Sequence, residues 1–299
     1  MSPGWLLVRA AGPLSTVQDL GRPGHAHEGV PPSGALDRPS HRLANRLVGN
    51  PATAATLEVT LGGLAVTLGG DGPARSVALT GAPAPLRVGG RHAPLYAPVA
   101  VRPGETVELG LATHGLRCYL AVAGGIVVPA ELGSRSADLL SGLGPPPLEP
   151  GTRLPLGDAL AAPAAVDVAA AAGPPAPAAG IATVAVVPGP RSDRLGPGGW
   201  EALVAADWTV APTSNRVGLR LTGPRLPVLA GEVPPEGIAT GALQLPPGGR
   251  PVVFLADHPV TGGYPVVAVV AGEAGLAALA QLRPGAAVRF APHHPFLVT

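Results

Sequence analysis

Short runs of apolar residues, separated by turns that contain Gly or Pro, make up most of the chain. The clearest of these runs are Thr56-Leu-Glu-Val-Thr-Leu61, Leu64-Ala-Val-Thr-Leu68, Arg117-Cys-Tyr-Leu-Ala-Val122 and Pro251-Val-Val-Phe-Leu255. Brief, closely spaced apolar runs that are bounded by turn residues are typical of β-strands in a sandwich or a barrel. The pattern therefore predicts a mainly β fold.

Three stretches have the features of short helices: 37–48, 198–206 and 272–282. In the first, Asp37 is suited to cap the helix and Pro39 to lie in its first turn. We therefore expect only a few short helices beside the strands.

An Ala/Pro-rich tract at 158–180 interrupts the strand pattern and has almost no charge. Such a composition suits a connector, so it predicts an N-terminal β domain at 1–157 and a C-terminal β domain at 181–299. The alternative is a short Ala-rich helix, interrupted at Pro163 and Pro174.

A weak internal repeat agrees with two similar halves. At one constant offset, Pro103-Gly104 and His114 align with Pro247-Gly248 and His258. Duplication predicts two related β domains, whereas chance matching between Gly/Pro-rich strands is the alternative.

Composition decides between a folded and a disordered chain. The 299 residues include 43 Gly and 39 Pro, a proportion at which disorder is a serious alternative. However, 46% of the residues are apolar and only 13% are charged, which is the reverse of a disordered composition. We therefore expect a globular protein rich in turns.

The charged residues and the cysteine count exclude several classes of function. All 20 basic residues are Arg, so a lysine Schiff base, a Walker A loop and an attached biotin are excluded. The single cysteine, Cys118, excludes an intrachain disulfide and a Cys-rich zinc site. A net charge of +1 with interspersed signs predicts no nucleic-acid partner. Apolar runs too short to span a membrane, an unpaired cysteine and no recognisable signal segment favour the cytoplasm.

The first polar cluster follows the first strands and contains Gln18, Asp19 and Arg22. Arg22 offers a planar fork for a carboxylate or a phosphate, and Gln18 and Asp19 are suited to hold an amide or carboxyl group. In the alternative, Asp19 and Arg22 only pin the loop to itself.

Two further clusters lie in the C-terminal half. Asn215 and Arg216 supply an amide and a guanidinium, although Asn also forms ordinary Asx turns. The longer cluster runs from Glu236 through Gln244 and Asp257 to Thr261-Gly-Gly-Tyr264. Its Gly pair allows a backbone to approach a ligand closely, but a Gly-Gly hairpin gives a similar pattern.

Histidines offer only a weak indication of a metal site. His25 and His27 have a spacing suited to chelation, and His293 and His294 lie near the end of the chain. A third ligand cannot be identified, so solvated histidines are the favoured interpretation and no metal is expected.

Several motifs in a fixed order, covering nearly the whole chain, resemble one protein family. They are Gly12-Pro-Leu-Ser-Thr-Val-Gln-Asp-Leu-Gly-Arg22, Val30-Pro-Pro-Ser-Gly-Ala-Leu-Asp37, Ala44-Asn-Arg-Leu-Val-Gly-Asn50 with Leu57-Glu58, Tyr119-Leu-Ala-Val-Ala-Gly-Gly125, Leu132-Gly-Ser-Arg-Ser136, Thr213-Ser-Asn-Arg216, Glu236-Gly237, Gln244-Leu-Pro246, Thr261-Gly-Gly-Tyr-Pro265 and Arg283-Pro-Gly285. The family is called KipA, allophanate hydrolase subunit 2 or the C subunit of 5-oxoprolinase, and also biotin-dependent carboxyltransferase domain. The chain departs from the family's pattern at Pro235 and at His258-Pro259-Val260, which affects the substrate more than the fold.

The resemblance implies two cyclophilin-like β-barrel domains in tandem. It also implies a complex with two other proteins, a KipI-like one (the B subunit of 5-oxoprolinase) and a LamB/YcsF-like one (the A subunit), in which ATP is used to open 5-oxo-L-proline to L-glutamate. The alternatives are a biotin-dependent carboxyltransferase acting on urea or a related amide, with biotin on another chain, and a non-catalytic regulator that binds a KipI-like kinase inhibitor.

Polarity and the motif match together suggest roles for individual residues. Glu236 and Asp257 are candidates for proton transfer. The candidates for binding the amide substrate are Gln18, Asp19, Arg22, Asn215, Arg216, Gln244, Thr261, Gly262, Gly263 and Tyr264.

Overall fold

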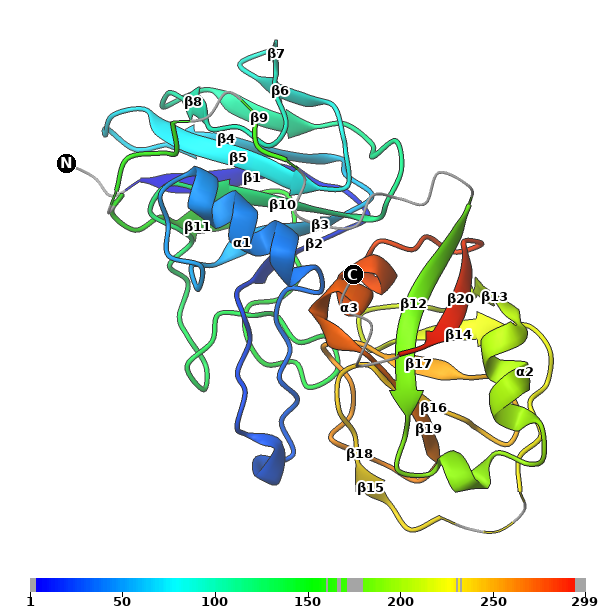
Figure 1. Cartoon of the computed structure of the whole chain (residues 1–299). Helices are drawn as coiled ribbons and strands as arrows, with labels where there is room; N and C mark the ends of the chain where they lie inside the picture. The colour runs from blue at the N-terminus through cyan, green and yellow to red at the C-terminus, as the bar shows by residue number, and fades with distance from the viewer. Residues whose placement is uncertain are drawn as a thin grey trace. The chain divides into compact units, whose positions relative to one another are not determined.

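The computed structural model describes residues 4–159, 161–165, 168–170, 180–229, 231 and 233–293. The chain forms two compact units (Figure 1). The N-terminal unit contains the chain up to Arg22, Ser33–Asp138, and the chain from Gly142 into the Ala/Pro tract. The C-terminal unit contains Pro23–Pro32, Leu139–Ser141 and the chain after the tract. Two short segments of the N-terminal half therefore belong to the C-terminal unit.

The N-terminal unit contains two antiparallel sheets. The six-stranded sheet has the order β11 (Arg153–Pro155), β1 (Trp5–Ala11), β4 (Leu64–Gly69), β9 (Thr106–Leu109), β6 (Leu86–Val88) and β7 (Arg91–Ala93). The five-stranded sheet has the order β2 (Leu14–Gln18), β3 (Thr56–Thr60), β10 (Arg117–Val122), β5 (Arg75–Gly81) and β8 (Val99–Val101).

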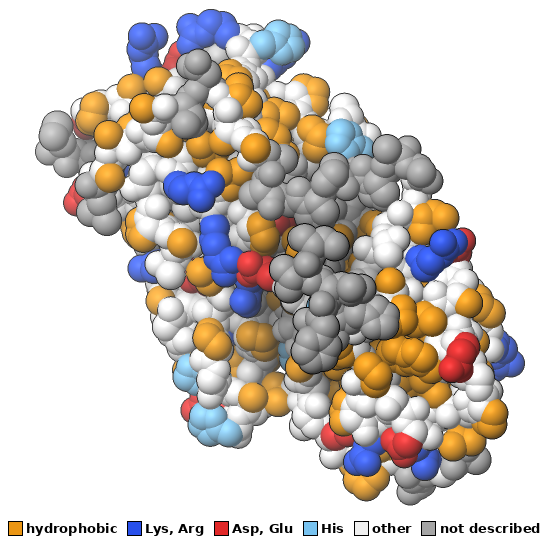
Figure 2. Space-filling view, viewed as in Figure 1, with side chains coloured by type: hydrophobic (Ala, Val, Ile, Leu, Met, Phe, Trp, Pro, Cys, Tyr) orange, Lys and Arg blue, Asp and Glu red, His pale blue; other side chains and the backbone are white. Residues whose placement is uncertain are grey.

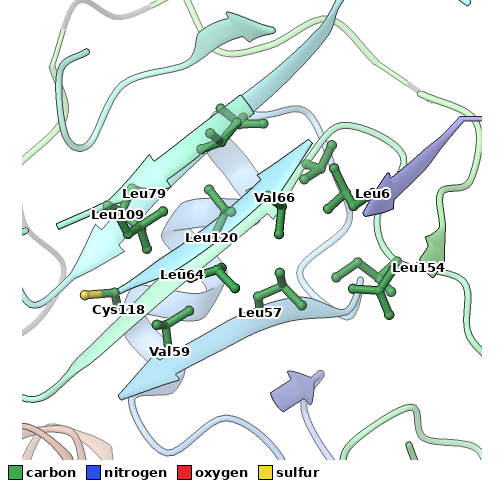
Figure 3. Packing of buried hydrophobic residues seen from close by; sticks show 14 of the residues in the cluster. Leu6, Leu57, Val59, Leu64, Val66, Leu79, Leu109, Cys118, Leu120 and Leu154 are labelled. Atoms are coloured by element: carbon green, nitrogen blue, oxygen red, sulfur yellow. The ribbon is translucent and has the colours of Figure 1, made fainter. Parts of the chain in front are cut away.

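A continuous apolar core joins these two sheets. Figure 3 shows side chains of β4 and of β3 and β10 directed toward one another, among them Leu64, Val66, Leu57 and Leu120. Because successive side chains of a strand point to opposite faces, alternate residues of β10 enter this core: Cys118, Leu120 and Val122.

The opposite face of β10 is covered by helix α1 (Arg38–Leu47). Tyr119 and Ala121 of β10 pack there with Leu43 and Leu47 of the helix. Asp37 caps the helix by accepting a hydrogen bond from the backbone N–H of Ser40 (3.0 Å), as its position in the sequence predicts. All six residues of β10 are consequently buried.

The C-terminal unit contains a closed barrel and a separate strand pair. The barrel has the order β12 (Ile181–Pro188), β19 (Val266–Val270), β16 (Ala242–Gln244), β17 (Val252–Phe254), β14 (Gly218–Thr222), β13 (Asp207–Val210) and β20 (Ala287–Pro292). Strand β15 (Glu236–Gly237) pairs with β18 (Thr261–Gly262) outside the barrel. The helical segments of this unit are η1 (Ala26–Glu28), η2 (Ser192–Arg194), α2 (Gly199–Ala205) and α3 (Gly272–Ala280).

The predicted mainly β fold with a few short helices is confirmed, since all three expected α-helices form within the predicted ranges. The four apolar runs that opened the sequence pattern become β3, β4, β10 and β17. The duplication stays a prediction; His114 is exposed whereas His258 is buried, so the aligned histidines have different surroundings.

Part of the predicted connector packs on the N-terminal unit. The backbone N–H of Ala164 donates to Leu47 O (2.9 Å), and that of Ala169 donates to Tyr96 O (2.7 Å). The described residues of the tract contain no helix, while 160, 166–167 and 171–179 lie outside the described residues. The predicted boundaries at 157 and 181 stay a prediction.

We predict that the Leu120→Ala substitution lowers the free energy of unfolding by about 2–5 kcal/mol, because it leaves a cavity in the core between the sheets. The matched control is Leu111→Ala in the same unit, where the side chain is 70% exposed and the expected change is below about 0.5 kcal/mol. Urea denaturation of both variants measures the difference. Equal losses for the two would contradict the packing of Leu120 in this core.

Candidate functional site

The carboxylate of Asp19 connects the chain after β2 to residues 134–136. Its Oδ1 accepts hydrogen bonds from Gly21 N (2.8 Å), Ser134 Oγ (2.6 Å) and Ser136 Oγ (2.6 Å). Its Oδ2 accepts from Arg135 N (2.7 Å). Asp19 therefore holds its own loop in place, as the structural interpretation of this residue predicts. It also holds the Leu132–Ser136 motif, which lies more than a hundred residues away along the chain.

Arg22 is a buried cation whose hydrogen bonds go to backbone carbonyls. Its Nη2 donates to Ser136 O (2.5 Å) and its Nε to Glu131 O (3.3 Å), while Nη1 is buried without a partner. None of the ion pairs among the described residues includes Arg22, whose exposed fraction is 1%. A buried guanidinium without a counter-charge is costly, so this position is suited to an anion.

The side chain of Gln18 has an unused hydrogen-bond acceptor, whereas that of Arg22 has an unused donor. Its Nε2 donates to Ala137 O (2.8 Å) and to Thr16 Oγ1 (3.1 Å), while Oε1 is buried without a donor. Gln18 and Arg22 thus bind the consecutive carbonyls of Ala137 and Ser136, and each retains one unused polar atom. One unused acceptor and one unused charged donor complement a molecule that carries an N–H and an anionic oxygen.

The loop around Ser33 packs tightly against this segment. Ser33 (φ 52°) and Gly34 (φ 95°) both adopt left-handed backbone conformations, and Ser33 Oγ donates to Ala137 O (3.2 Å). A Cβ at Gly34 would lie 2.8 Å from Gly21 N. Glycine is therefore required at position 34 both by φ and by the close approach of the backbone.

A buried network around Glu58 supports the same loop, although no role for this residue was expected from the sequence. Glu58 Oε2 accepts hydrogen bonds from Leu36 N (3.0 Å) and Tyr119 Oη (2.8 Å), and Arg117 Nε lies 3.5 Å from Oε1. Burial, and then the charge of Glu58, raise the pKa of Tyr119 well above its usual value. The sequence did contain a signal for this network: Glu58 is a carboxylate inside an apolar strand, between the core residues Leu57 and Val59.

His41 in α1 lies in this polar interior, with both ring nitrogens engaged. Nδ1 is 2.9 Å from Thr56 Oγ1, and Nε2 is 3.1 Å from Ala52 O. Burial lowers the pKa of His41 from 6.5 to about 4, because the imidazolium loses its hydration.

In the C-terminal unit, Arg216 and Asp257 form a buried two-pronged ion pair. Arg216 Nε donates to Asp257 Oδ2 (2.9 Å) and Nη2 to Oδ1 (2.9 Å). Oδ2 also accepts from Leu139 N (3.2 Å), so the pair anchors the Leu139–Ser141 segment. The carboxylate of Asp257 is fully buried, which favours a structural role; its part in proton transfer stays a prediction.

The neighbouring positions have local structural roles. Asn215 is exposed, and its Oδ1 accepts from Val217 N (2.9 Å) and Gly218 N (3.3 Å), which is the Asx turn of the alternative interpretation. His258, at the departure from the family's pattern, is buried with its ring 6.2 Å from that of Phe254.

The last predicted cluster gathers around the strand pair β15–β18. Glu236 accepts from Arg191 Nε (3.1 Å) and Val266 N (3.3 Å). Gln244 Nε2 donates to Tyr264 O (2.8 Å). A Cβ at Gly262 would lie 2.5 Å from Gln244 Nε2, so a larger residue there would displace the Gln244 side chain. Thr261–Gly262 pairs with Glu236–Gly237, which lies some 25 residues earlier in the chain.

Thr261, Gly263 and Tyr264 of this cluster are exposed, whereas Gln244 is buried. The predicted site residues therefore form three groups. One, in the N-terminal unit, contains Gln18, Asp19 and Arg22. The other two, in the C-terminal unit, are the ion pair of Arg216 with Asp257, beside Asn215, and the cluster of Glu236, Gln244 and residues 261–264. The substrate-binding and catalytic assignments stay predictions.

Neither a metal site nor a membrane-spanning helix is found in the described part of the chain. No group of three or more His, Cys, Asp or Glu side chains there is arranged to hold a metal ion. His25 Nδ1 instead lies 2.5 Å from Glu28 Oε2. No described helix is long and apolar enough to cross a membrane. On the face drawn in Figure 2, charged side chains of both signs are scattered in small groups.

Comparison with known proteins relates this arrangement to a family. Residues 28–292 match the model of the carboxyltransferase domain, subdomains A and B. The chain belongs to this family. It is 37% identical to the C subunit of 5-oxoprolinase from Escherichia coli (strain K12) over 289 residues, which cover 95% of this chain and 90% of the relative. The resemblance noted in the sequence is therefore confirmed.

Larger proteins contain the same domain. The chain is 34% identical to urea amidolyase of Saccharomyces cerevisiae over 97% of its own length but only 17% of that protein. The crystal structure of the Kluyveromyces lactis urea amidolyase superposes with a TM-score of 0.87 at 31% identity, covering 98% of this chain and 19% of that one.

We predict that His41 makes the fold sensitive to acid. The unfolded chain binds a proton at His41 below about pH 6.5, but the folded chain does so only below about pH 4. Stability is therefore lost as the pH falls through this interval, by about 3 kcal/mol in total. Unfolding free energies measured from pH 7 to 4 should decrease less steeply for His41→Gln. The exposed control His27→Gln should keep the wild-type slope, and a wild-type slope in His41→Gln would contradict the assignment.

We also predict that breaking the Arg216–Asp257 pair is far more destabilising than breaking an exposed pair of the same geometry. Arg216→Ala should cost about 3–5 kcal/mol, because it leaves a buried carboxylate without its cation. The control pair is Arg289–Asp207, with contacts of 2.7 and 2.9 Å on the surface. Arg289→Ala should cost far less, because solvent screens an exposed pair and an unpaired surface charge stays hydrated. Chemical denaturation measures both, and comparable losses would contradict the role given to burial.

Proposed function

We propose that the chain is the substrate-binding subunit of a 5-oxoprolinase complex, which opens 5-oxo-L-proline to L-glutamate with the use of ATP. In this proposal the other members of the complex are a KipI-like and a LamB/YcsF-like protein. The similarity to the C subunit of 5-oxoprolinase supports it, because the alignment covers 90% of that relative. The urea amidolyases are matched over only 17% of their length.

The observation that carries the proposal is the pair of unused polar atoms on Gln18 and Arg22. In 5-oxoproline the lactam N–H and the carboxylate are attached to the same carbon, so a donor and an anion lie side by side. Gln18 Oε1 is an acceptor for the N–H, and Arg22 Nη1 is a donor and counter-charge for the carboxylate. A neutral amide without the carboxylate would leave the charge of Arg22 uncompensated.

The remaining chemistry requires activation of the lactam carbonyl. Amides are poor electrophiles, and phosphorylation by ATP together with stabilisation of the developing oxyanion overcomes this. No nucleophile is identified among the described residues of this chain, and ATP is assigned to the complex as a whole. Glu236, whose side chain is partly exposed, is a better candidate for proton transfer than the fully buried Asp257.

A carboxyltransferase acting on urea is the second candidate, and the structural match to urea amidolyase favours it. Because the chain contains no lysine, biotin would have to be attached to another chain. Urea has N–H groups for Gln18 but no carboxylate for Arg22. The charge state of the preferred ligand therefore separates the two candidates.

We predict that Arg22→Gln lowers kcat/KM for 5-oxoproline roughly ten- to hundred-fold in the reconstituted complex of the three proteins, because a charged hydrogen bond is lost. The measurement is ATP-dependent glutamate release. Arg87→Gln, an exposed arginine of the same unit, is the control and should leave the rate unchanged.

A binding measurement separates this role from a loss of folding. Wild-type protein should bind 5-oxoproline more tightly than pyrrolidin-2-one, which lacks the carboxylate, and Arg22→Gln should remove this preference while the three proteins still co-purify. Absence of ATP-dependent glutamate release by the wild-type complex, or wild-type turnover in Arg22→Gln, would refute the proposal.

A further inference from the structure

Ser136 contacts both charged residues of the N-terminal polar cluster. Its hydroxyl is bound to Asp19 twice, since it donates to Oδ1 (2.6 Å) and accepts from the backbone N–H of Asp19 (3.0 Å). Its backbone carbonyl accepts from Arg22 Nη2 (2.5 Å). Ser136 is fully buried, so water does not compete for these hydrogen bonds. Ser136 therefore links the carboxylate of Asp19 to the guanidinium of Arg22.

The contact with Ser136 O sets the direction of the Arg22 guanidinium. Among the described residues, the other hydrogen bond of this side chain runs from Nε to Glu131 O and is longer (3.3 Å), which makes it weaker. Nη1 has no partner, so it contributes nothing to holding the group in place. A shift of Ser136 O would therefore turn the guanidinium and move Nη1, which is the atom proposed to bind the carboxylate of the ligand.

Several neighbours fix the position of this carbonyl. The peptide between Ser136 and Ala137 is planar, and its N–H donates to Val17 O (3.0 Å), which directs its C=O the opposite way. The backbone N–H of Ser136 donates to Ser134 Oγ (3.0 Å). The backbone of Gly144 packs so closely that a Cβ there would overlap with Ser136 O. The carbonyl therefore has little freedom to move in the folded chain.

Of the contacts made by Ser136, those of its hydroxyl depend on the side chain at this position. Without the hydroxyl, the backbone N–H of Asp19 loses its acceptor, and Asp19 Oδ1 loses one of its donors. A buried donor without an acceptor is costly, so the two segments should readjust their positions. Because Arg22 binds one of these segments and follows Asp19 closely in the other, the readjustment reaches its guanidinium.

We propose that Ser136 is a positioning residue for substrate recognition, which keeps Arg22 Nη1 where it binds the carboxylate of the substrate. Ser136 itself does not touch the substrate. Asp19 supports Ser136 in this role, since both of its carboxylate oxygens already accept hydrogen bonds. The inference rests on the proposed function, because it assumes that Arg22 binds the carboxylate of 5-oxoproline.

Binding to the full chain tests this role, with 5-oxoproline and pyrrolidin-2-one as probes. Ser136→Ala should weaken 5-oxoproline about three-fold or more and leave pyrrolidin-2-one unchanged, because only the charged hydrogen bond is impaired. The matched control is Ser15→Ala: Ser15 is also fully buried, and its hydroxyl donates to Ala11 O (2.7 Å). This control should keep the wild-type preference between the probes. A wild-type preference in Ser136→Ala would overturn the inference.

Kinetics of the reconstituted complex of the three proteins give a second measurement. Ser136→Ala should raise KM for 5-oxoproline and change kcat by less than about two-fold, because the carboxylate is bound equally in the ground state and the transition state. A lower kcat with an unchanged KM would overturn the positioning role.

A double-mutant cycle separates positioning from a general loss of stability. If Ser136 acts through Arg22, Ser136→Ala should not weaken 5-oxoproline further in the Arg22→Gln background. Additive losses would overturn the inference. Urea denaturation checks that each variant is folded; if Ser136→Ala is not, Asp19→Asn takes its place, because it keeps Ser136 but changes the acceptor of its hydroxyl.

The two proposals fail in distinguishable ways. If the wild-type chain does not prefer 5-oxoproline to pyrrolidin-2-one, the role of Arg22 in the proposed function is wrong, and this inference fails with it. If the wild-type chain and Ser136→Ala show the same preference while Arg22→Gln loses it, the proposed function stands and the role of Ser136 alone is wrong.

Discussion

The carboxylate of Asp19 is the contact on which the N-terminal polar cluster depends. It accepts four hydrogen bonds, and three of them come from Ser134, Arg135 and Ser136. These bonds hold the 131–137 segment beside the end of β2, where its carbonyls become the partners of Gln18 and Arg22. Without this carboxylate, the serine hydroxyls and the backbone N–H would be buried without acceptors, which is costly.

The same region carries polar atoms that the fold leaves unsatisfied. Gln18 Oε1 and Arg22 Nη1 are both buried without partners, although most buried polar groups in proteins are paired. Groups of this kind reduce the stability of the free protein and become favourable when a complementary ligand is present. The nearby network of Glu58, Tyr119 and His41 reaches the end of β2 through Thr56, whose hydroxyl contacts His41 and lies 3.5 Å from Gln18 O.

Two of the polar clusters use buried charge in different ways. Asp19 and Arg22 are separate charges held mainly by backbone and hydroxyl groups, whereas Arg216 and Asp257 neutralise each other directly. A mutually satisfied pair has little capacity left for a ligand, and it is suited to anchor Leu139–Ser141.

The sequence alone determined the secondary structure closely, because its signals are local. Short apolar runs bounded by Gly/Pro turns indicated β3, β4, β10 and β17, and the Asp37-Pro39 pattern indicated the start of α1. Polar residue type and the ordered motifs also identified Gln18, Arg22, Arg216 and Asp257 as unusual positions, and the family match confirms the relationship that those motifs indicated.

Tertiary structure decided which of these residues retain unused polar atoms. No local pattern indicates that Asp257 is neutralised by Arg216, because this pair depends on where the chain returns after β14. The Asx turn of Asn215, by contrast, is a local contact that its residue type allowed for. The contacts of Ser134 and Glu58 were not predicted for the same reason. Both residues lie in motifs that mark the family, but their partners Asp19 and Tyr119 come from segments distant along the chain.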